Sequence, residues 1–201
     1  MRFLFVLSIF GCTSFALSAQ SLNERVVQVA NTYAGGGYKW AGSGTPKDLI
    51  FNATKILGKS PEGTYCSGYT FTVAFDVMNE KGMFAGLDVP TMKRFQQDWY
   101  GSNDAAAETQ CVIALEKLGL GKAVALADAK AGDFVQFWRN NKTGHSVIFL
   151  NWIKDAQGRI TGIKYRSTQK LTDGIGERTE TIGSGEKDIN IERLYVARLK
   201  G

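Results

Sequence analysis

Apolar residues recur at helical spacing in the first half of the chain. A helix is predicted over 21–34, where Ser21 and Glu24 form a capping box that satisfies the amides of the first turn. A second apolar stretch follows Gly68, and Gly82 is placed to end it. This stretch predicts a buried central helix, whose apolar positions are Phe71, Ala74, Phe75 and Met78.

Two further segments lie around this central helix. A second apolar stripe predicts a helix over 105–118, which Gly119 ends. The segment 42–65 contains Pro46 and Pro61 and only a short apolar patch. We therefore expect an irregular insertion there, with one helical turn.

After Gly132 the hydrophobic period changes to two, which is typical of strands. Segments rich in Asn, Asp and Gly separate the alternating stretches and predict turns. Helices followed by an antiparallel meander give an α+β fold class. The predicted strands are 134–138, 146–152, 159–165 and 189–196.

The N-terminus has the pattern of an export signal. A positive start, an apolar run over 3–10 and then small residues predict a signal peptide over 1–19. The mature chain, 20–201, is long enough for one well-buried core, so we expect a single domain that is periplasmic or secreted. The run is shorter than the ~20 residues that a spanning helix needs, so no stable membrane span is expected. Lipidation at Cys12 ranks below simple cleavage, because Phe10 is bulky for a lipobox.

The charge pattern and composition exclude several classes of function. The 24 basic and 19 acidic residues give a net charge of +5 and are interleaved, so no arm for nucleic acid is expected. A single histidine and three cysteines make a poor zinc site. The glycines at 35–37 lack the lysine of a phosphate-binding loop. We therefore expect neither a metal nor a cofactor.

The main candidate for chemistry is Cys66, in the segment 65–68 that opens the central helix. The positive end of a helix dipole and its free amides favour the thiolate, which is the nucleophilic form. The amides of Cys66 and its neighbours are also placed to bind an oxyanion, and the small Ser67 leaves room for substrate. The alternative is a structural cysteine, buried or in a disulfide with Cys111.

His145 is the chain's single histidine and the only candidate for an imidazole base. It lies at the start of an apolar strand, where a side chain can project from the sheet edge toward the end of a helix. A thiol and an imidazole far apart in the sequence are the usual partners of a cysteine hydrolase. We therefore predict that Cys66 and His145 meet in the folded protein.

A third polar group usually orients the imidazole. Strand alternation places Tyr165, Ser167 and Gln169 on one face. Gln169 is the first choice, because its amide oxygen can accept a hydrogen bond from a ring nitrogen. Asn151 shares a face with His145 but is too far along the strand for direct contact.

Four short elements together resemble the NlpC-type cell-wall peptidases, a papain-like superfamily. They occur in the family's order, at 37–42, 66–68, 131–137 and 144–149. The chain departs from the family in several ways. Tyr65 replaces an aspartate, the insertion before Cys66 is longer, and residues 83–125 form an expansion. The third polar residue of the site, often histidine in the family, has no histidine equivalent here.

The resemblance implies a papain-like NlpC-type fold, with the helix of the cysteine packed on an antiparallel sheet. It also implies hydrolysis of an amide bond in peptidoglycan stem peptides through a thioester on Cys66, with His145 as the base. Gln169 or Ser167 would take the place of the third polar residue. The implied partner is peptidoglycan or a muropeptide.

Two aromatic residues belong to the first of these elements. Tyr38 either points into the cleft, where its hydroxyl can assist the oxyanion, or packs against the first helix, and packing against that helix is the expectation for Trp40. Asp133 is interpreted as a turn residue.

Two rival functions remain open. A non-catalytic envelope-binding module of the same fold would agree with Tyr65 and with a Cys66–Cys111 disulfide. An acyl transfer on a substrate other than peptidoglycan would use the same nucleophile.

Overall fold

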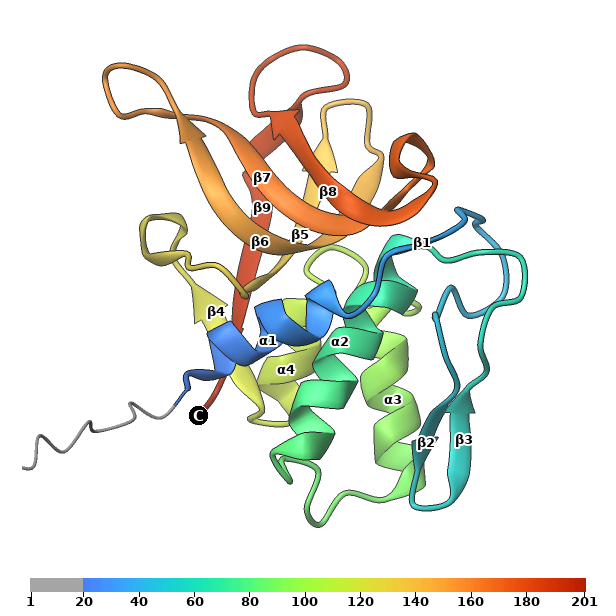
Figure 1. The fold of residues 1–201 in the computed structure, drawn as a ribbon. Coiled ribbons are helices and arrows are strands. Elements are labelled where there is room, and N and C mark those ends of the chain that lie inside the picture. Colours follow the sequence, from blue (N-terminus) through green and yellow to red (C-terminus); the bar gives the residue numbers. More distant parts are fainter. Residues whose placement is uncertain (1–19) are drawn as a thin grey trace, which may run out of the picture.

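The computed structural model describes residues 20–201. The expected signal peptide over 1–19 and the alternative lipidation site Cys12 lie outside these residues. The described chain folds into helices packed on an antiparallel sheet, an α+β arrangement (Figure 1). Its α-helices are α1 (Leu22–Asn31), α2 (Cys66–Glu80), α3 (Val89–Trp99) and α4 (Cys111–Lys117).

Within these residues a seven-stranded sheet has the order β1-β8-β7-β6-β5-β9-β4, and every neighbouring pair is antiparallel. The predicted strands correspond to β5, β6, β7 and β9, whereas β1, β4 and β8 were not predicted. The strands are β1 (Gly35–Gly36), β4 (Gly121–Val124), β5 (Phe134–Arg139), β6 (Gly144–Lys154), β7 (Ile160–Gln169), β8 (Gly174–Thr181) and β9 (Ile189–Leu199).

The sheet curls on itself so that β8 approaches β9. A bridge between Ile182 and Ile189 joins the end of one strand to the start of the other. The inward-facing side chains of β5, β6, β7 and β9 fill the space inside the curl, because alternate residues of a strand point to one face. This inner cluster includes Val135, Phe137, Val147, Phe149, Trp152, Ile163, Tyr165 and Val196.

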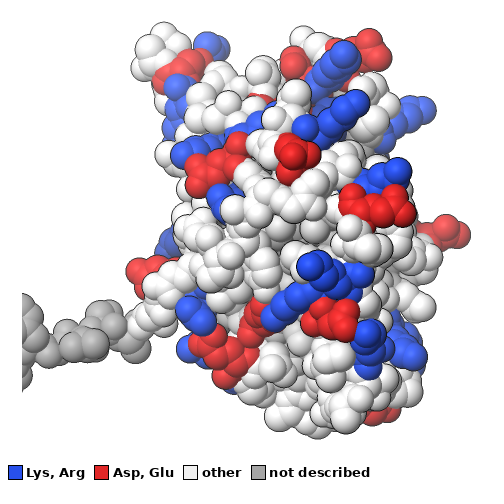
Figure 2. Space-filling view, turned by 45° about the vertical axis from the view of Figure 1, so that its right-hand side comes forward, with Lys and Arg blue, Asp and Glu red and all other residues white. Residues whose placement is uncertain are grey.

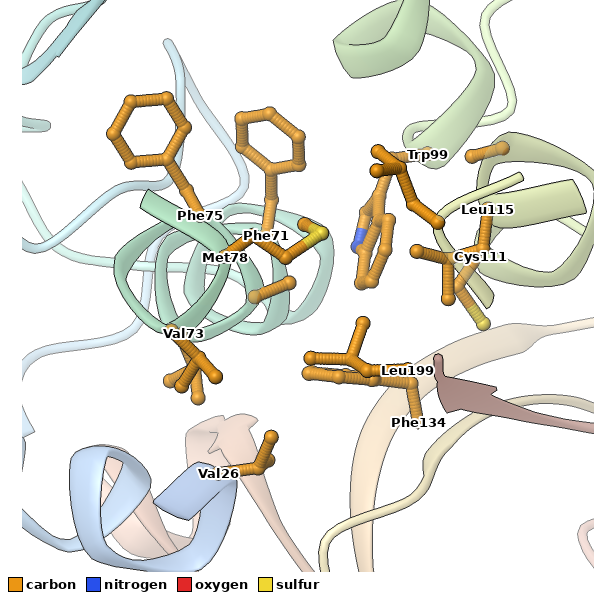
Figure 3. Close-up of a cluster of buried hydrophobic side chains, with 14 of the residues drawn as sticks. Val26, Phe71, Val73, Phe75, Met78, Trp99, Cys111, Leu115, Phe134 and Leu199 are labelled. Atoms are coloured by element: carbon orange, nitrogen blue, oxygen red, sulfur yellow. The ribbon is translucent and has the colours of Figure 1, made fainter. Parts of the chain in front are cut away.

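The other face of the sheet packs on the helices. Helix α2 lies between α1 and α3, and its N-terminal end points at the strands (Figure 1). Trp99 of α3 lies in the centre of this second core, with its ring 5.1 Å from that of Phe134 in an edge-to-face contact (Figure 3). Helix α2 is buried along most of its length because it has neighbours on all sides.

Helix α3 was missed, although its signals are present in the sequence. Asp88 caps it by accepting a hydrogen bond from the Thr91 amide at 2.8 Å, and Met92, Phe95 and Trp99 form its buried face. The helix predicted over 105–118 begins only at Cys111, because Gln110 has φ 42° and ψ −103°, which no helix can accommodate.

The helical turn expected within 42–65 is wrong. The segment forms a hairpin of β2 (Leu49–Phe51) and β3 (Thr54–Leu57). Its turn is made by Asn52 and Ala53, with φ of 47° and 60°. Leu49 and Phe51 are buried and alternate with an exposed residue, which is the period of a strand.

Acidic and basic side chains are interleaved over the face drawn in Figure 2, and neither sign forms a large patch there. Among residues 20–201, no helix is long and apolar enough to span a bilayer.

Candidate active site

A cleft of about 250 Å³ opens where the N-terminus of α2 meets β5 and β6. Gly68 permits this position, because a Cβ on it would lie 2.3 Å from the carbonyl carbon of Gly44. The loop before the hairpin can therefore pack directly against the first turn of α2. The cleft is lined by Trp40, Tyr65, Cys66, Ser67, Tyr100, Ser102, Gln110, Gln136, Trp138, Gly144, His145 and Ser146.

Cys66 is the first residue of α2 and is partly exposed in this cleft. Burial raises the pKa of its thiol, but the charge of the His145 imidazolium and a hydrogen bond to that ring oppose it. Hydrogen bonds from the Ser146 amide and the Ser67 hydroxyl act in the same direction. Together they lower the pKa of Cys66 from 9.0 to about 7, so much of the sulfur is thiolate at neutral pH.

His145 lies on β6, directly opposite Phe137 of β5. Its ring is held between two aromatic edges, 5.7 Å from Phe137 and 5.5 Å from Tyr165, and the residue is only 7% exposed. The sheet therefore fixes the imidazole in the cleft beside the end of α2, within hydrogen-bonding reach of Cys66, although the two residues lie 79 positions apart in the sequence.

Gln169, at the end of β7, orients the imidazole. Its Oε1 lies 3.4 Å from His145 Nε2, while its Nε2 donates to Thr172 Oγ1 at 2.7 Å. The Thr172 hydroxyl donates its own hydrogen to the Gly174 carbonyl at 2.6 Å, so it can only accept from Gln169, and this fixes which end of the amide faces the ring. Because Oε1 can only accept, Nε2 of His145 carries a hydrogen in both the neutral and the charged ring, and Nδ1 is the nitrogen that can exchange a proton with the thiol.

The backbone at the start of α2 supplies free donors. The first hydrogen bond within the helix is donated by the Tyr69 amide to Tyr65 O at 3.0 Å. The amides of Cys66, Ser67 and Gly68 precede it and have no acceptor within the helix. Such amides can bind the negative oxygen that forms when a thiolate attacks a carbonyl carbon.

Tyr38 lies in the strand-like segment beside Thr64, with which it forms a parallel bridge. Burial raises the pKa of Tyr38, and the charge of Cys66 raises it further, while Arg139 lowers it. The phenol is therefore close enough to sense the thiolate and remains a proton donor at neutral pH.

One wall of the cleft consists of uncharged polar side chains that sequence reasoning missed. Ser146 Oγ lies 2.7 Å from Gln136 Oε1, 3.2 Å from Gln110 Oε1 and 3.4 Å from Ser67 Oγ. Gln136 could have been found, because a glutamine inside an apolar strand needs a buried partner. No sequence pattern marks Gln110 as a residue of the cleft, because its position depends on the strained backbone before α4.

Three other candidate residues lie away from the cleft. Ser167 is fully buried and donates to the Ser146 carbonyl at 2.7 Å, so its hydroxyl joins two strands. Asn151 is exposed further along β6. Asp133 accepts two hydrogen bonds from Arg198, each at 2.7 Å, and so ties the loop before β5 to β9.

The position expected for Trp40 is wrong. Instead of packing on α1, it is 77% exposed and stacks on Tyr65, with ring centroids 6.1 Å apart and planes inclined by 16°. Tyr65 in turn meets Tyr100 edge to face at 6.0 Å. Tyr65 thus supports an exposed aromatic wall.

Cys66 and Cys111 are both free thiols in the described chain, so they form no disulfide with each other. Cys111 is 2% exposed in the helical core (Figure 3), and burial raises its pKa to about 12. The two cysteines therefore differ strongly in reactivity.

Among the described residues, no group of three or more His, Cys, Asp and Glu side chains could hold a metal ion.

The site has the parts of a cysteine nucleophile with a base, an orienting amide and free backbone donors. Models of known protein families do not match the chain, and comparison with curated proteins also gives no match.

Proposed function

We propose that this protein is an exported cysteine hydrolase that cleaves amide bonds in peptidoglycan stem peptides. The observation that carries the proposal is the coupling of Cys66 to His145, which lowers the pKa of the thiol to about 7 at the mouth of a cleft. Activated thiols of this kind are concentrated at catalytic sites.

In the proposed reaction the Cys66 thiolate attacks the carbonyl carbon of the amide. The oxygen becomes negative and is met by the amides at the start of α2 and by the Tyr38 hydroxyl. The His145 imidazolium gives its proton to the amine as the C–N bond breaks, which leaves a thioester on the sulfur.

Water then attacks the thioester carbonyl, and neutral His145 accepts a proton from it. The C–S bond breaks, the carboxylic acid leaves and gives its remaining proton to solvent, and the Cys66 thiolate and the imidazolium are restored. Gln169 acts through the imidazole in both steps, since it holds the ring in one orientation and one tautomer.

The choice of peptidoglycan rests on the four elements that resemble NlpC-type peptidases, and with it we propose the papain-like NlpC-type fold. The arrangement of a cysteine helix against an antiparallel sheet supports this proposal. The signal-like sequence at residues 1–19 supports a periplasmic or secreted location, where the substrate occurs.

The test is mass spectrometry of purified muropeptides incubated with residues 20–201. Wild type should release products whose masses show addition of water across one amide, and Cys66→Ala should release none while keeping its circular dichroism spectrum. Cys111→Ala is the matched control and should retain cleavage. Equal cleavage by wild type and Cys66→Ala would exclude the nucleophile, and transfer products without added water would assign acyl transfer instead.

A further inference from the structure

The lining of the cleft is uncharged apart from the catalytic pair. Of the described residues that form it, none is Lys, Arg, Asp or Glu. Its polar groups include the hydroxyls and amides of Ser67, Ser102, Gln110, Gln136 and Ser146. A charged substrate group buried against such a surface would lose its hydration without gaining an opposite charge.

The guanidinium of Arg139 is close enough to sense the charge of Cys66, but its nitrogens are already occupied. Nε and Nη2 donate to the Glu180 carboxylate, and Nη1 lies 3.3 Å from Thr143 Oγ1. Arg139 is therefore held in a neutral pair with Glu180 and does not line the cleft.

The rim of the cleft has an exposed aromatic face. Trp40 is 77% exposed and stands at the edge of the cleft, where aromatic side chains commonly contact ligands. The ring of Tyr65 lies against one side of the indole and holds it, so the opposite side is open to a ligand. An indole face carries partial negative charge and attracts C–H groups that gather on one face of a saturated ring.

A second tryptophan of the cleft is also held rigidly. Trp138 donates from Nε1 to the Glu108 carbonyl at 2.9 Å, and Arg193 lies over its ring at 5.1 Å. Arg193 is itself fixed by the Glu108 carboxylate at 2.9 and 2.6 Å. Rigid aromatic walls with neutral donors between them lose little entropy when a ligand binds.

These features match an N-acetylated sugar. Its pyranose ring has a face of C–H groups, its amide and hydroxyl groups are uncharged, and it is covalently joined to the stem peptide in peptidoglycan. We propose that the cleft binds the sugar-bearing end of the substrate, with one pyranose ring stacked on Trp40. The inference rests on the proposed function and narrows its substrate from stem peptides in general to glycan-linked peptides.

The test uses the Cys66→Ala variant, which should bind substrate without cleaving it. Its affinity is measured by calorimetry for a disaccharide pentapeptide and for the same pentapeptide without sugar. We expect tighter binding of the sugar-bearing ligand, and Trp40→Ala in the same background should weaken that binding about fivefold to tenfold. Binding of the free pentapeptide should not change.

The control variant is Ile50→Ala, which removes another exposed apolar side chain, 48% exposed, from the β2–β3 hairpin. It should leave both affinities unchanged. Equal affinity of the Cys66→Ala variant for the two ligands, or a Trp40→Ala effect of the same size on both, would overturn the sugar assignment. The proposed hydrolase function would then still stand if wild type cleaves muropeptides, whereas absence of any cleavage would remove both proposals.

Discussion

Replacing His145 by asparagine should raise the pKa of Cys66 and change how its reactivity depends on pH. The ring supplies the two largest interactions that lower this pKa, while burial raises it, so the variant thiol should titrate at or above its ordinary value of 9.0. At pH 7 about half of the wild-type thiol would be thiolate, against about 1% in the variant.

The change in rate is smaller than this ratio. A thiolate of higher pKa is intrinsically more nucleophilic, by about eightfold over two pKa units. Alkylation of the variant at pH 7 should therefore be only about sixfold slower than that of wild type, and at high pH it should be faster. The pH profiles of the alkylation rate for wild type and variant should cross at about pH 8.

The assay is alkylation by iodoacetamide from about pH 5 to 10, followed by mass spectrometry of the peptide that contains Cys66. Cys111 serves as an internal control for folding, because a thiol that is 2% exposed with its pKa raised to about 12 should stay unmodified. The reasoning would be refuted if wild-type Cys66 titrated near 9, or if the two profiles had the same midpoint.

Two further substitutions test the surroundings of the imidazole. Gln169→Leu removes a hydrogen bond worth about 1 kcal/mol, so kcat/KM for muropeptide cleavage should fall about fivefold or more. The thermal unfolding midpoint should change little. An unaltered kcat/KM would contradict the orienting role of Gln169. Glu180→Gln leaves Arg139 partly buried without its carboxylate and should lower the free energy of unfolding by about 3 kcal/mol in urea titrations at neutral pH. Burial raises the pKa of Glu180, but Arg139 outweighs burial and holds that pKa below its ordinary 4.5. The stabilisation is therefore present above pH 4.5 and disappears as the pH falls through the lowered pKa of Glu180. If wild type and variant still differed in free energy of unfolding in strong acid, this assignment would be contradicted.

Much of the fold could be predicted, because long segments carry a clear hydrophobic period. Helix α2 and the strands β5, β6, β7 and β9 each bury a continuous face, and their residues repeat at the spacing of that face. The β2–β3 hairpin was not predicted, because its strands are only three and four residues long and Ala53 rarely takes the left-handed conformation of a turn. Strand β8 was missed because its residues after Ile175 are glycine or polar, so no apolar residue recurs at the spacing of a strand.

The candidate site could be predicted only in part. The residues Cys66, His145 and Gln169 could be selected because each has a chemical signature and a position at the end of an element. Gln110 reaches the cleft through a backbone conformation that depends on tertiary packing, so no local pattern marks it. The exposure of Trp40 also depends on a distant contact, since it stacks on Tyr65 and not on the neighbouring helix.

The sheet ends in two short strands, and this affects how the protein behaves at high concentration. The outermost strands, β1 and β4, have only two and four residues, and β4 carries the exposed Lys122. A long open edge would offer a row of unpaired backbone groups to another copy of the chain and so promote polymerisation. The short strands β1 and β4 give such a copy little to join, and the part of β8 beyond β1 carries the charged residues Glu177, Arg178 and Glu180, which disfavour pairing with another strand.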